Sequence, residues 1–301
     1  MRGCETLTLH HGALAFTAYA AGAGPLVLLV HGFPDLPATW APQVQALAKA
    51  GYRAVAVTCR GYEAGSRPAD ANYQLTALAD DVAAWLDDLN AEQAHLVGHD
   101  WGASIAYAAA ARNPQRFVSL CTMAVPHTGR FAAAMAKSAK QLWLSRYIVM
   151  FQIRELAERR LAAHDFAYVD TLWQRWSPGW DYDINLTRAV RQRFAEPGAL
   201  AAVLAYYRQG ADGKTAQGKL ARQLSQQPVP VSTLALHGER DGCIDPAIFR
   251  QSLVPADFPA GVEIETLKDC GHFLHREQPE QTNRLLLDWL GRHPIEGGSL
   301  A

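Results

Sequence analysis

The sequence contains an aspartate in a setting that favours nucleophilic attack. Asp100 lies in the segment GHDWG at 98–102, between a strand-like apolar run at 94–98 and a helix-like run at 101–112. A sharp strand-to-helix turn with small neighbours exposes its central side chain, and the helix that follows favours negative charge there. A carboxylate in this position can attack an alkyl carbon and form an ester. The alternative interpretation is that Asp100 only caps the helix.

An acid and a base follow this aspartate in the chain order that such a turn predicts. Asp241 follows a strand-like run at 231–237, and His272 follows another at 262–267. Ligands of open α/β sheets bind at the carboxyl ends of the strands, so we expect both side chains at the site. Asp245 is a rival acid, and Asp241 is favoured because it lies closer to its strand and can be held more firmly beneath a histidine. Four other histidines are expected to bond only backbone or loop groups: His31, His99, His127 and His237.

A fourth segment, HGFP at 31–34, directly follows the apolar run at 25–30. The backbone N–H of Phe33 can pair with that of Trp101 to stabilise an oxyanion. This is the donor pair expected of such a fold, because one donor follows the nucleophile and the other comes from an early strand–helix loop. The alternative for the segment alone is an ordinary turn.

Apolar runs alternate with helical patterns at both ends of the chain. Fully apolar runs are typical of strands buried on both faces, as in parallel sheets. The expected strands are 6–11, 13–20, 25–30, 52–58, 94–98, 118–125, 231–237 and 262–267, and the clearest helices are 75–89, 101–112 and 279–291. This alternation predicts an α/β fold with a mostly parallel, doubly wound, eight-stranded sheet.

Residues 128–227 interrupt the alternation with an all-helical insertion. Helical patterns cover 131–144, 154–163 and 187–195, and no convincing buried strand is present. The segment carries four of the eight tryptophans and five of the ten tyrosines. We expect a helical cap at 128–227 over a core formed by 1–127 and 228–301. About two thirds of the cap aromatics should join cap to core, and the others should line a pocket.

Composition excludes several classes of function. Lysine and arginine number 28 against 29 aspartates and glutamates, so the net charge is −1 and predicts neither nucleic acid nor a membrane surface as partner. The charge-free stretch at 12–30 contains turn residues that split it into two strand-like halves, which argues against a membrane anchor. The five scattered cysteines predict buried free thiols in the reducing cytoplasm. No metal or nucleotide motif is present, so no cofactor is expected.

The segments HGFP, GHDWG, GERD at 238–241 and GHFLHREQPE at 271–280 together resemble the α/β-hydrolase family over essentially the whole chain. Within that family the match is to the epoxide hydrolase branch, which is close to the dehalogenases with an aspartate nucleophile. The resemblance implies a cofactor-independent hydrolase of the α/β-hydrolase fold. Its substrates would be water and a small apolar epoxide, and the protein would be a monomer or a homodimer.

The resemblance also implies roles for cap residues. Epoxide hydrolases use two cap tyrosines to donate hydrogen bonds to the epoxide oxygen. Tyr207, in YYR at 206–208, resembles the second of these, and Tyr147, in RYIVMFQ at 146–152, resembles the first on a shorter motif. For each, the alternative is a packed core tyrosine. The side chains expected against the substrate are Phe33, Trp101, Phe151 and Phe273.

Two other functions stay open at this point. A haloalkane or haloacid dehalogenase would use the same aspartate, and although Phe33 cannot donate to a halide, a cap tryptophan such as Trp143 or Trp176 could. Fluoroacetate-cleaving relatives carry arginines where this chain has Trp101 and Ser104, which disfavours a carboxylate substrate. A ligand receptor without catalysis is a third hypothesis, and a serine esterase is disfavoured because no serine occupies the turn.

Overall fold

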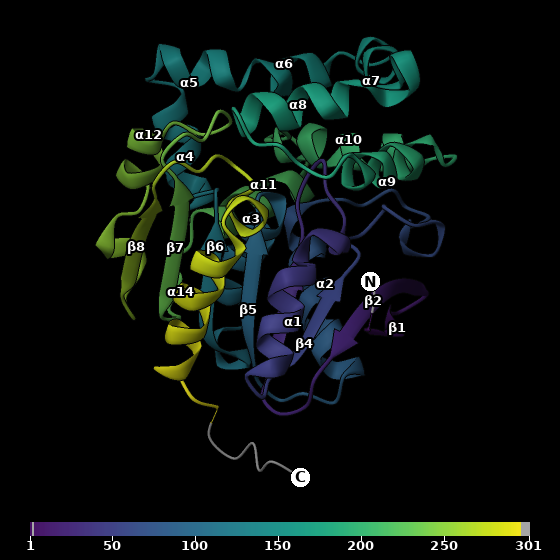
Figure 1. The fold of residues 1–301 in the computed structure, drawn as a ribbon. Coiled ribbons are helices and arrows are strands. Elements are labelled where there is room, and N and C mark those ends of the chain that lie inside the picture. Colours follow the sequence, from purple (N-terminus) through teal and green to yellow (C-terminus); the bar gives the residue numbers. More distant parts are fainter. Residues whose placement is uncertain (2, 296–301) are drawn as a thin grey trace.

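The computed structural model describes residues 1 and 3–295 and contains one eight-stranded sheet (Figure 1). The strand order is β1-β2-β4-β3-β5-β6-β7-β8, and only the β1–β2 and β2–β4 pairs are antiparallel. The mostly parallel sheet predicted from the sequence is therefore confirmed. The strands are β1 Glu5–His11, β2 Leu14–Ala21, β3 Leu26–Val30, β4 Arg53–Val57, β5 Ala94–His99, β6 Phe117–Met123, β7 Thr233–Gly238 and β8 Val262–Leu267.

Both faces of the sheet are covered, which explains the fully apolar central strands. Alternate β3 side chains enter different hydrophobic clusters, with Leu28 on the face that α2 and α3 cover and Leu29 on the face that α1 and α14 cover. Side chains alternate between faces along a strand, so both sets of positions must be apolar. The core helices are α1 Ala41–Lys49, α2 Leu75–Asp88, α3 Trp101–Arg112, α12 Pro246–Gln251, α13 Leu274–Glu277 and α14 Pro279–Gly291.

Eight helices lie between β6 and β7, and Figure 1 shows them stacked beyond the carboxyl ends of the strands. They are α4 Thr128–Met135, α5 Ala139–Leu144, α6 Arg146–Gln152, α7 Leu156–Phe166, α8 Tyr168–Trp176, α9 Ile184–Ala195, α10 Ala199–Gly210 and α11 Ala216–Ser225. No strand occurs among the described residues 128–227, as the sequence predicts. We keep the name cap for this segment, and its independence as a domain stays a prediction.

One predicted cap helix, 131–144, is wrong because the chain breaks inside it. Helix α4 ends at Met135, and α5 begins at Ala139 with Ser138 as its N-cap. The backbone N–H of Gln141 donates to Ser138 Oγ at 3.1 Å. A serine side chain that satisfies a free N–H group starts a new helix instead of continuing the old one.

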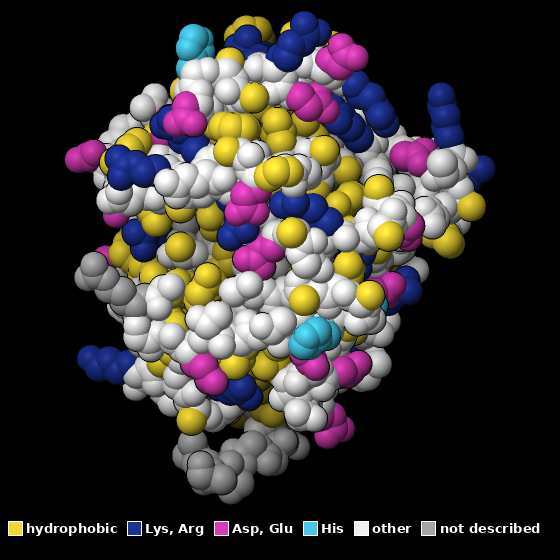
Figure 2. Space-filling model, turned by 90° about the vertical axis from the view of Figure 1, so that its right-hand side faces the viewer, with side chains coloured by type: hydrophobic (Ala, Val, Ile, Leu, Met, Phe, Trp, Pro, Cys, Tyr) yellow, Lys and Arg dark blue, Asp and Glu magenta, His cyan; other side chains and the backbone are white. Residues whose placement is uncertain are grey.

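The structure can be compared with what the composition predicts about surface charge, free thiols and membrane-spanning segments. Acidic and basic side chains are interspersed on the face shown in Figure 2. Cys59, Cys121, Cys243 and Cys270 are buried free thiols, as predicted, whereas Cys4 is only partly buried. Within the described part of the chain, every helix is too short or too polar to cross a bilayer.

The glycines around β5 and α3 allow the close approach that builds the strand-to-helix turn. A methyl group on Gly102 would overlap the carbonyl oxygen of Val30 in β3, and one on Gly98 would overlap the carbonyl oxygen of Gly102. Only a residue without a side chain lets α3 begin directly against the sheet. This packing fixes where the end of β5 presents its next residue, Asp100.

We therefore expect Gly102→Ala to lower the free energy of unfolding by about 2 kcal/mol or more, because the added methyl group meets rigid backbone. Gly291→Ala is the matched control. That glycine is the last residue of α14, and an added methyl group there would meet nothing within 4 Å. The control should be neutral or slightly stabilising. Urea denaturation of both variants measures the difference, and equal stabilities would contradict the close-approach argument.

Candidate active site

Asp100 occupies the strained turn between β5 and α3. Its φ is 53° and its ψ is −120°, and its N–H donates to the carbonyl oxygen of Met123 in β6 at 3.1 Å. A positive φ in a residue other than glycine is uncommon and is held only where surrounding structure enforces it. The side chain accepts no hydrogen bond from α3. The alternative that Asp100 is merely a helix cap is therefore wrong.

The carboxylate of Asp100 instead faces the loop after β3. The backbone N–H of Phe33 donates to Asp100 Oδ1 at 2.7 Å. Trp101 is the first residue of α3, where N–H groups have no partner inside the helix. Of the two predicted oxyanion donors, the Phe33 N–H thus already binds a carboxylate oxygen of Asp100. The other, the Trp101 N–H, lies at the positive N-terminal end of α3.

His272 lies between two carboxylates from different strand ends. Its Nδ1 is 2.9 Å from Asp241 Oδ2, and its Nε2 is 3.4 Å from Asp100 Oδ2. Asp241 Oδ1 accepts hydrogen bonds from the backbone N–H groups of Cys243 and Ile244, at 2.6 and 2.9 Å. The three predicted residues are therefore brought together: a hydrogen bond to Asp241 holds the histidine ring, and its Nε2 faces Asp100 without a hydrogen bond.

The rival acid Asp245 lies elsewhere. Its Oδ1 accepts a hydrogen bond from the N–H of Ala247, which makes it the N-cap of α12. Its Oδ2 pairs with Lys140 Nζ at 2.7 Å. The geometry therefore favours Asp241 over Asp245, as the sequence argument does.

The two carboxylates control the charge of His272. Burial by itself lowers the pKa of this side chain, but Asp241 and Asp100 outweigh burial and raise the pKa to about 10. Burial likewise opposes ionisation of Asp241, and the nearby His272 outweighs it, so the pKa of Asp241 lies below its ordinary value. The histidine is therefore a cation while Asp100 is a free carboxylate.

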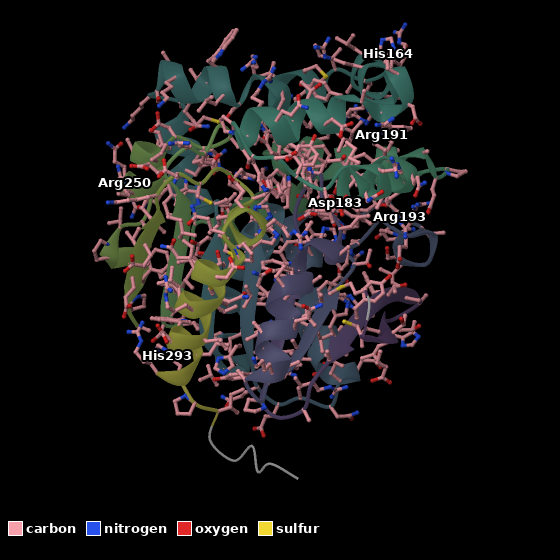
Figure 3. The ribbon with its side chains drawn as sticks, in the orientation of Figure 1. His164, Asp183, Arg191, Arg193, Arg250 and His293 are labelled. Carbon is pink, nitrogen blue, oxygen red and sulfur yellow. The ribbon has the colours of Figure 1, made fainter. Side chains whose placement is uncertain are left out.

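The cap holds the backbone of His272 by hydrogen bonds. The His272 N–H lies 3.1 Å from the Trp176 carbonyl oxygen and 3.0 Å from Ser177 Oγ, both at the end of α8. The Trp176 carbonyl also accepts from Gly242, next to Asp241. Further out, Arg193, labelled in Figure 3, pairs with Glu63 of the core at 3.3 Å. Cap and core are thus joined at the site itself.

The other predicted histidines bond backbone groups, as expected. His99 Nε2 is 3.0 Å from the carbonyl oxygen of His272, so it supports the catalytic residue from behind. The remaining three bond the carbonyl oxygens of neighbouring loops: His31 to Gly32, His127 to Gln227 and His237 to Ile244.

One buried group among the described residues could hold a metal ion, and no sequence motif indicated it. Asp35, His99 and His275 each bring a possible ligand atom to within 4.8 Å of the others. Both Asp35 oxygens already accept hydrogen bonds, from the Leu36 N–H at 2.7 Å and from the Thr39 hydroxyl at 2.9 Å. Burial raises the pKa of Asp35 to about 7 despite these bonds. The chemistry below does not use this group.

A cavity of about 570 Å³ adjoins Asp100 and lies between core and cap. Many of its walls are apolar or aromatic. Its lining includes Asp100, Trp101, Ser104, Tyr147, Tyr207 and Cys243. A cavity of this size can enclose most of a small organic molecule.

Two cap tyrosines and Asp100 line the same cavity. The ring centroids of Tyr147 and Tyr207 are 5.8 Å apart. The Tyr207 hydroxyl is buried without a hydrogen-bond partner, whereas the hydroxyl of its neighbour Tyr206 donates to the Arg60 carbonyl oxygen at 2.7 Å. Burial raises the pKa of Tyr147 and of Tyr207 well above the usual value, so both are protonated.

The residues expected against the substrate divide into two sets. Trp101 lines the cavity, whereas Phe33, Phe151 and Phe273 are not among its lining residues. These phenylalanines are fully buried behind it, and the Phe33 ring packs against Phe151 and Tyr207 with centroids 5.5 and 5.3 Å apart. Phe33 and Phe151 pack against the cavity tyrosines, whereas the Phe273 ring packs against His272 and Trp173, with centroids 5.4 and 4.2 Å apart.

The two tryptophans considered as halide donors also differ. Trp143 is 66% exposed, so the expectation that it could face the buried site is wrong. It sits on the outer side of α5, where Arg146 stacks over its ring at 4.0 Å. Trp176 packs 5.0 Å from the His272 ring, and its buried Nε1 has no hydrogen-bond partner.

Comparisons with known proteins agree with this geometry. A family profile described as the alpha/beta hydrolase family matches residues 27–285. The AB hydrolase superfamily protein YfhM of Bacillus subtilis is 27% identical over 96% of this chain and 99% of its own length. Epoxide hydrolase 3 of Xenopus tropicalis is 30% identical over 88% of this chain and 71% of its own. The solved structure of an epoxide hydrolase from an endophytic Streptomyces is similar with a TM-score of 0.82 and 25% identity, covering 97% of this chain and 96% of that one.

The raised pKa of His272 predicts a pH dependence of stability. The folded protein keeps a proton on His272 that the unfolded chain releases above pH 6.5, so the stabilisation is complete below pH 6.5 and is lost as the pH rises towards about 10. The variant His272→Gln has no imidazole to bind this proton and therefore lacks this pH-dependent stabilisation. The difference in free energy of unfolding between wild type and variant should therefore shrink over this interval. Denaturation curves at several pH values measure it, and parallel pH profiles would contradict the assignment.

Proposed function

This chain belongs to the alpha/beta hydrolase family, and we propose that it is an epoxide hydrolase that converts a small apolar epoxide and water into a vicinal diol. The observation that carries the proposal is the pair of protonated tyrosines, Tyr147 and Tyr207, on the wall of the cavity that also holds Asp100. Relatives and solved structures described as epoxide hydrolases support it. The mechanism needs no cofactor.

In the first step Asp100 attacks a carbon of the epoxide ring. Oδ1 is already held by the Phe33 N–H, so Oδ2 forms the new C–O bond and Oδ1 becomes the ester carbonyl. The ring C–O bond breaks, and its oxygen takes a proton from Tyr147 or Tyr207. The products are a hydroxyalkyl ester on Asp100 and one tyrosinate.

In the second step His272 activates water. Ester formation removes the charge of Asp100, one of the two carboxylates that raise the pKa of His272, so His272 gives its proton through water to the tyrosinate and becomes neutral. Neutral His272, oriented by Asp241, takes a proton from water, which attacks the ester carbonyl carbon. The N–H groups of Phe33 and Trp101 stabilise the charge on Oδ1, an effect of roughly 10²–10³ in rate per donor. Collapse passes the second proton of the water to the leaving alkoxide and releases the diol, and His272 is again the cation with which the cycle began.

A dehalogenase is the second candidate, and one observation favours it. Trp101 lines the cavity beside Asp100, and Trp176, whose ring packs against His272, has a buried indole N–H without a partner, so these two indoles are the possible halide donors. The same ester and the same His272 would then complete the reaction. The positions at which fluoroacetate-cleaving relatives carry arginine hold Trp101 and Ser104 here, so a haloacid would lack its cationic partner.

Turnover of a small substrate panel tests the proposal. Wild-type protein is given styrene oxide, cyclohexene oxide, 1-bromobutane and fluoroacetate, and diol and free halide are measured. We expect diol without halide and no turnover by Asp100→Ala. In His272→Gln the first step should proceed and the second should stop, so mass spectrometry should find the epoxide mass added to the protein. Halide without diol would establish the dehalogenase, and turnover by Asp100→Ala would remove the nucleophile assignment.

The adjacent tyrosines offer a matched pair of variants. Tyr207→Phe should slow epoxide opening by about 10²-fold or more, because it removes a proton donor. Tyr206→Phe should have a much smaller effect, since its hydroxyl is bound to Arg60. Single-turnover rates measure both, and a ratio near one would argue against an acid role for Tyr207.

A further inference from the structure

Cys243 touches both halves of the candidate active site. It lies two residues after Asp241, in the loop between β7 and α12, and only 3% of it is exposed. It also lines the cavity beside Asp100. The sequence indicated no more than a buried thiol at this position.

The backbone of Cys243 is fixed from two directions. Its N–H donates to Asp241 Oδ1 at 2.6 Å, and its carbonyl oxygen accepts from Gln141 Nε2 of α5 at 2.9 Å. Core and cap therefore determine together where the Cβ–Sγ bond points. These bonds do not involve the thiol, so replacing the side chain leaves them in place.

The thiol lies against the hydroxyl of Tyr147. Sγ is 3.6 Å from the Tyr147 oxygen, within the range of hydrogen bonds to sulfur, and either atom can donate. The rings of Phe151, Trp176 and Tyr207 also pack against Tyr147. The Tyr207 hydroxyl has no partner at full hydrogen-bond geometry, and its polar neighbour is the side chain of Trp101, which acts to lower the pKa of Tyr207. The two tyrosines thus have different polar groups beside their hydroxyls.

We infer that Cys243 is a positioning residue that keeps the Tyr147 hydroxyl facing the epoxide and donates its S–H to the phenolate oxygen formed during ring opening. The inference rests on the proposed function, because it assigns to Tyr147 a share of the protonation.

The proton balance is simple. The Tyr147 O–H proton moves to the epoxide oxygen as the C–O bond breaks, and the phenolate oxygen accepts a hydrogen bond from the thiol. Cys243 keeps its proton throughout, because burial raises the pKa of the thiol well above its usual value. His272 restores the Tyr147 proton through water once the ester has formed.

The test is the single-turnover rate of ester formation with styrene oxide, followed by tryptophan fluorescence in the wild-type background. Cys243→Ala should slow this step about fivefold, since thiol hydrogen bonds are weaker than those of hydroxyls. Cys243→Ser supplies a new donor and should recover most of the rate. Cys243→Val fills the space without a donor and should stay slow. The rate of ester hydrolysis should change less than twofold in all three.

Double variants identify the partner of the thiol. When Cys243→Ala is added to Tyr147→Phe, the rate of ester formation should fall no further. When it is added to Tyr207→Phe, the rate should fall by the full fivefold. Cys121→Ala removes a thiol that is equally buried, in β6 away from the cavity, and controls for a general loss of packing.

Each outcome decides a separate question. If Cys243→Val restores the rate of ester formation and Cys243→Ser does not, the side chain of Cys243 only fills space, and the inference is wrong. It is also wrong if the losses from Cys243→Ala and Tyr147→Phe multiply. If the wild-type protein forms no ester with any epoxide, the proposed function itself fails, independently of Cys243.

Discussion

One imidazolium held between two buried carboxylates is the interaction on which the site depends. Asp100 and Asp241 come from separate strand ends, and His272 reaches both. A buried charge is costly unless an opposite charge or a hydrogen bond compensates it. The His272 cation supplies that compensation to Asp241 and faces Asp100. The same arrangement responds to the reaction, because an ester on Asp100 removes the charge that favours the cation.

The cap is needed for this arrangement as well as for binding a substrate. The end of α8 provides the Trp176 carbonyl and the Ser177 hydroxyl that meet the backbone of His272. Cap tyrosines and core residues then enclose a single cavity. Cys243 belongs to the same junction, since its carbonyl bonds the cap and its N–H bonds the catalytic acid. Excluding water from this junction strengthens each of these polar contacts.

The main elements of the fold could be read from local patterns. Strands such as β3 and β5 are apolar on both faces, and glycines at 98 and 102 mark the turn that presents Asp100. The helices of the cap were harder to predict, because their buried aromatics follow no regular spacing. They also break at positions such as Ser138, where the neighbouring packing decides that a new helix begins. Helices α6, α8, α10 and α11 were not individually predicted for this reason.

The sequence by itself determined the sheet, because each strand and turn depends on residues close together in the chain. It also placed the candidate nucleophile, acid and base at strand ends, whereas the candidate tyrosines follow only from the resemblance to epoxide hydrolases. Only the tertiary structure decided which acid meets the histidine, that Trp143 points outward, and that Asp35, His99 and His275 cluster behind the site. The contact of Cys243 with Tyr147 likewise joins residues 96 positions apart. Such contacts depend on how separate loops pack at one sheet edge, and no local pattern encodes that packing.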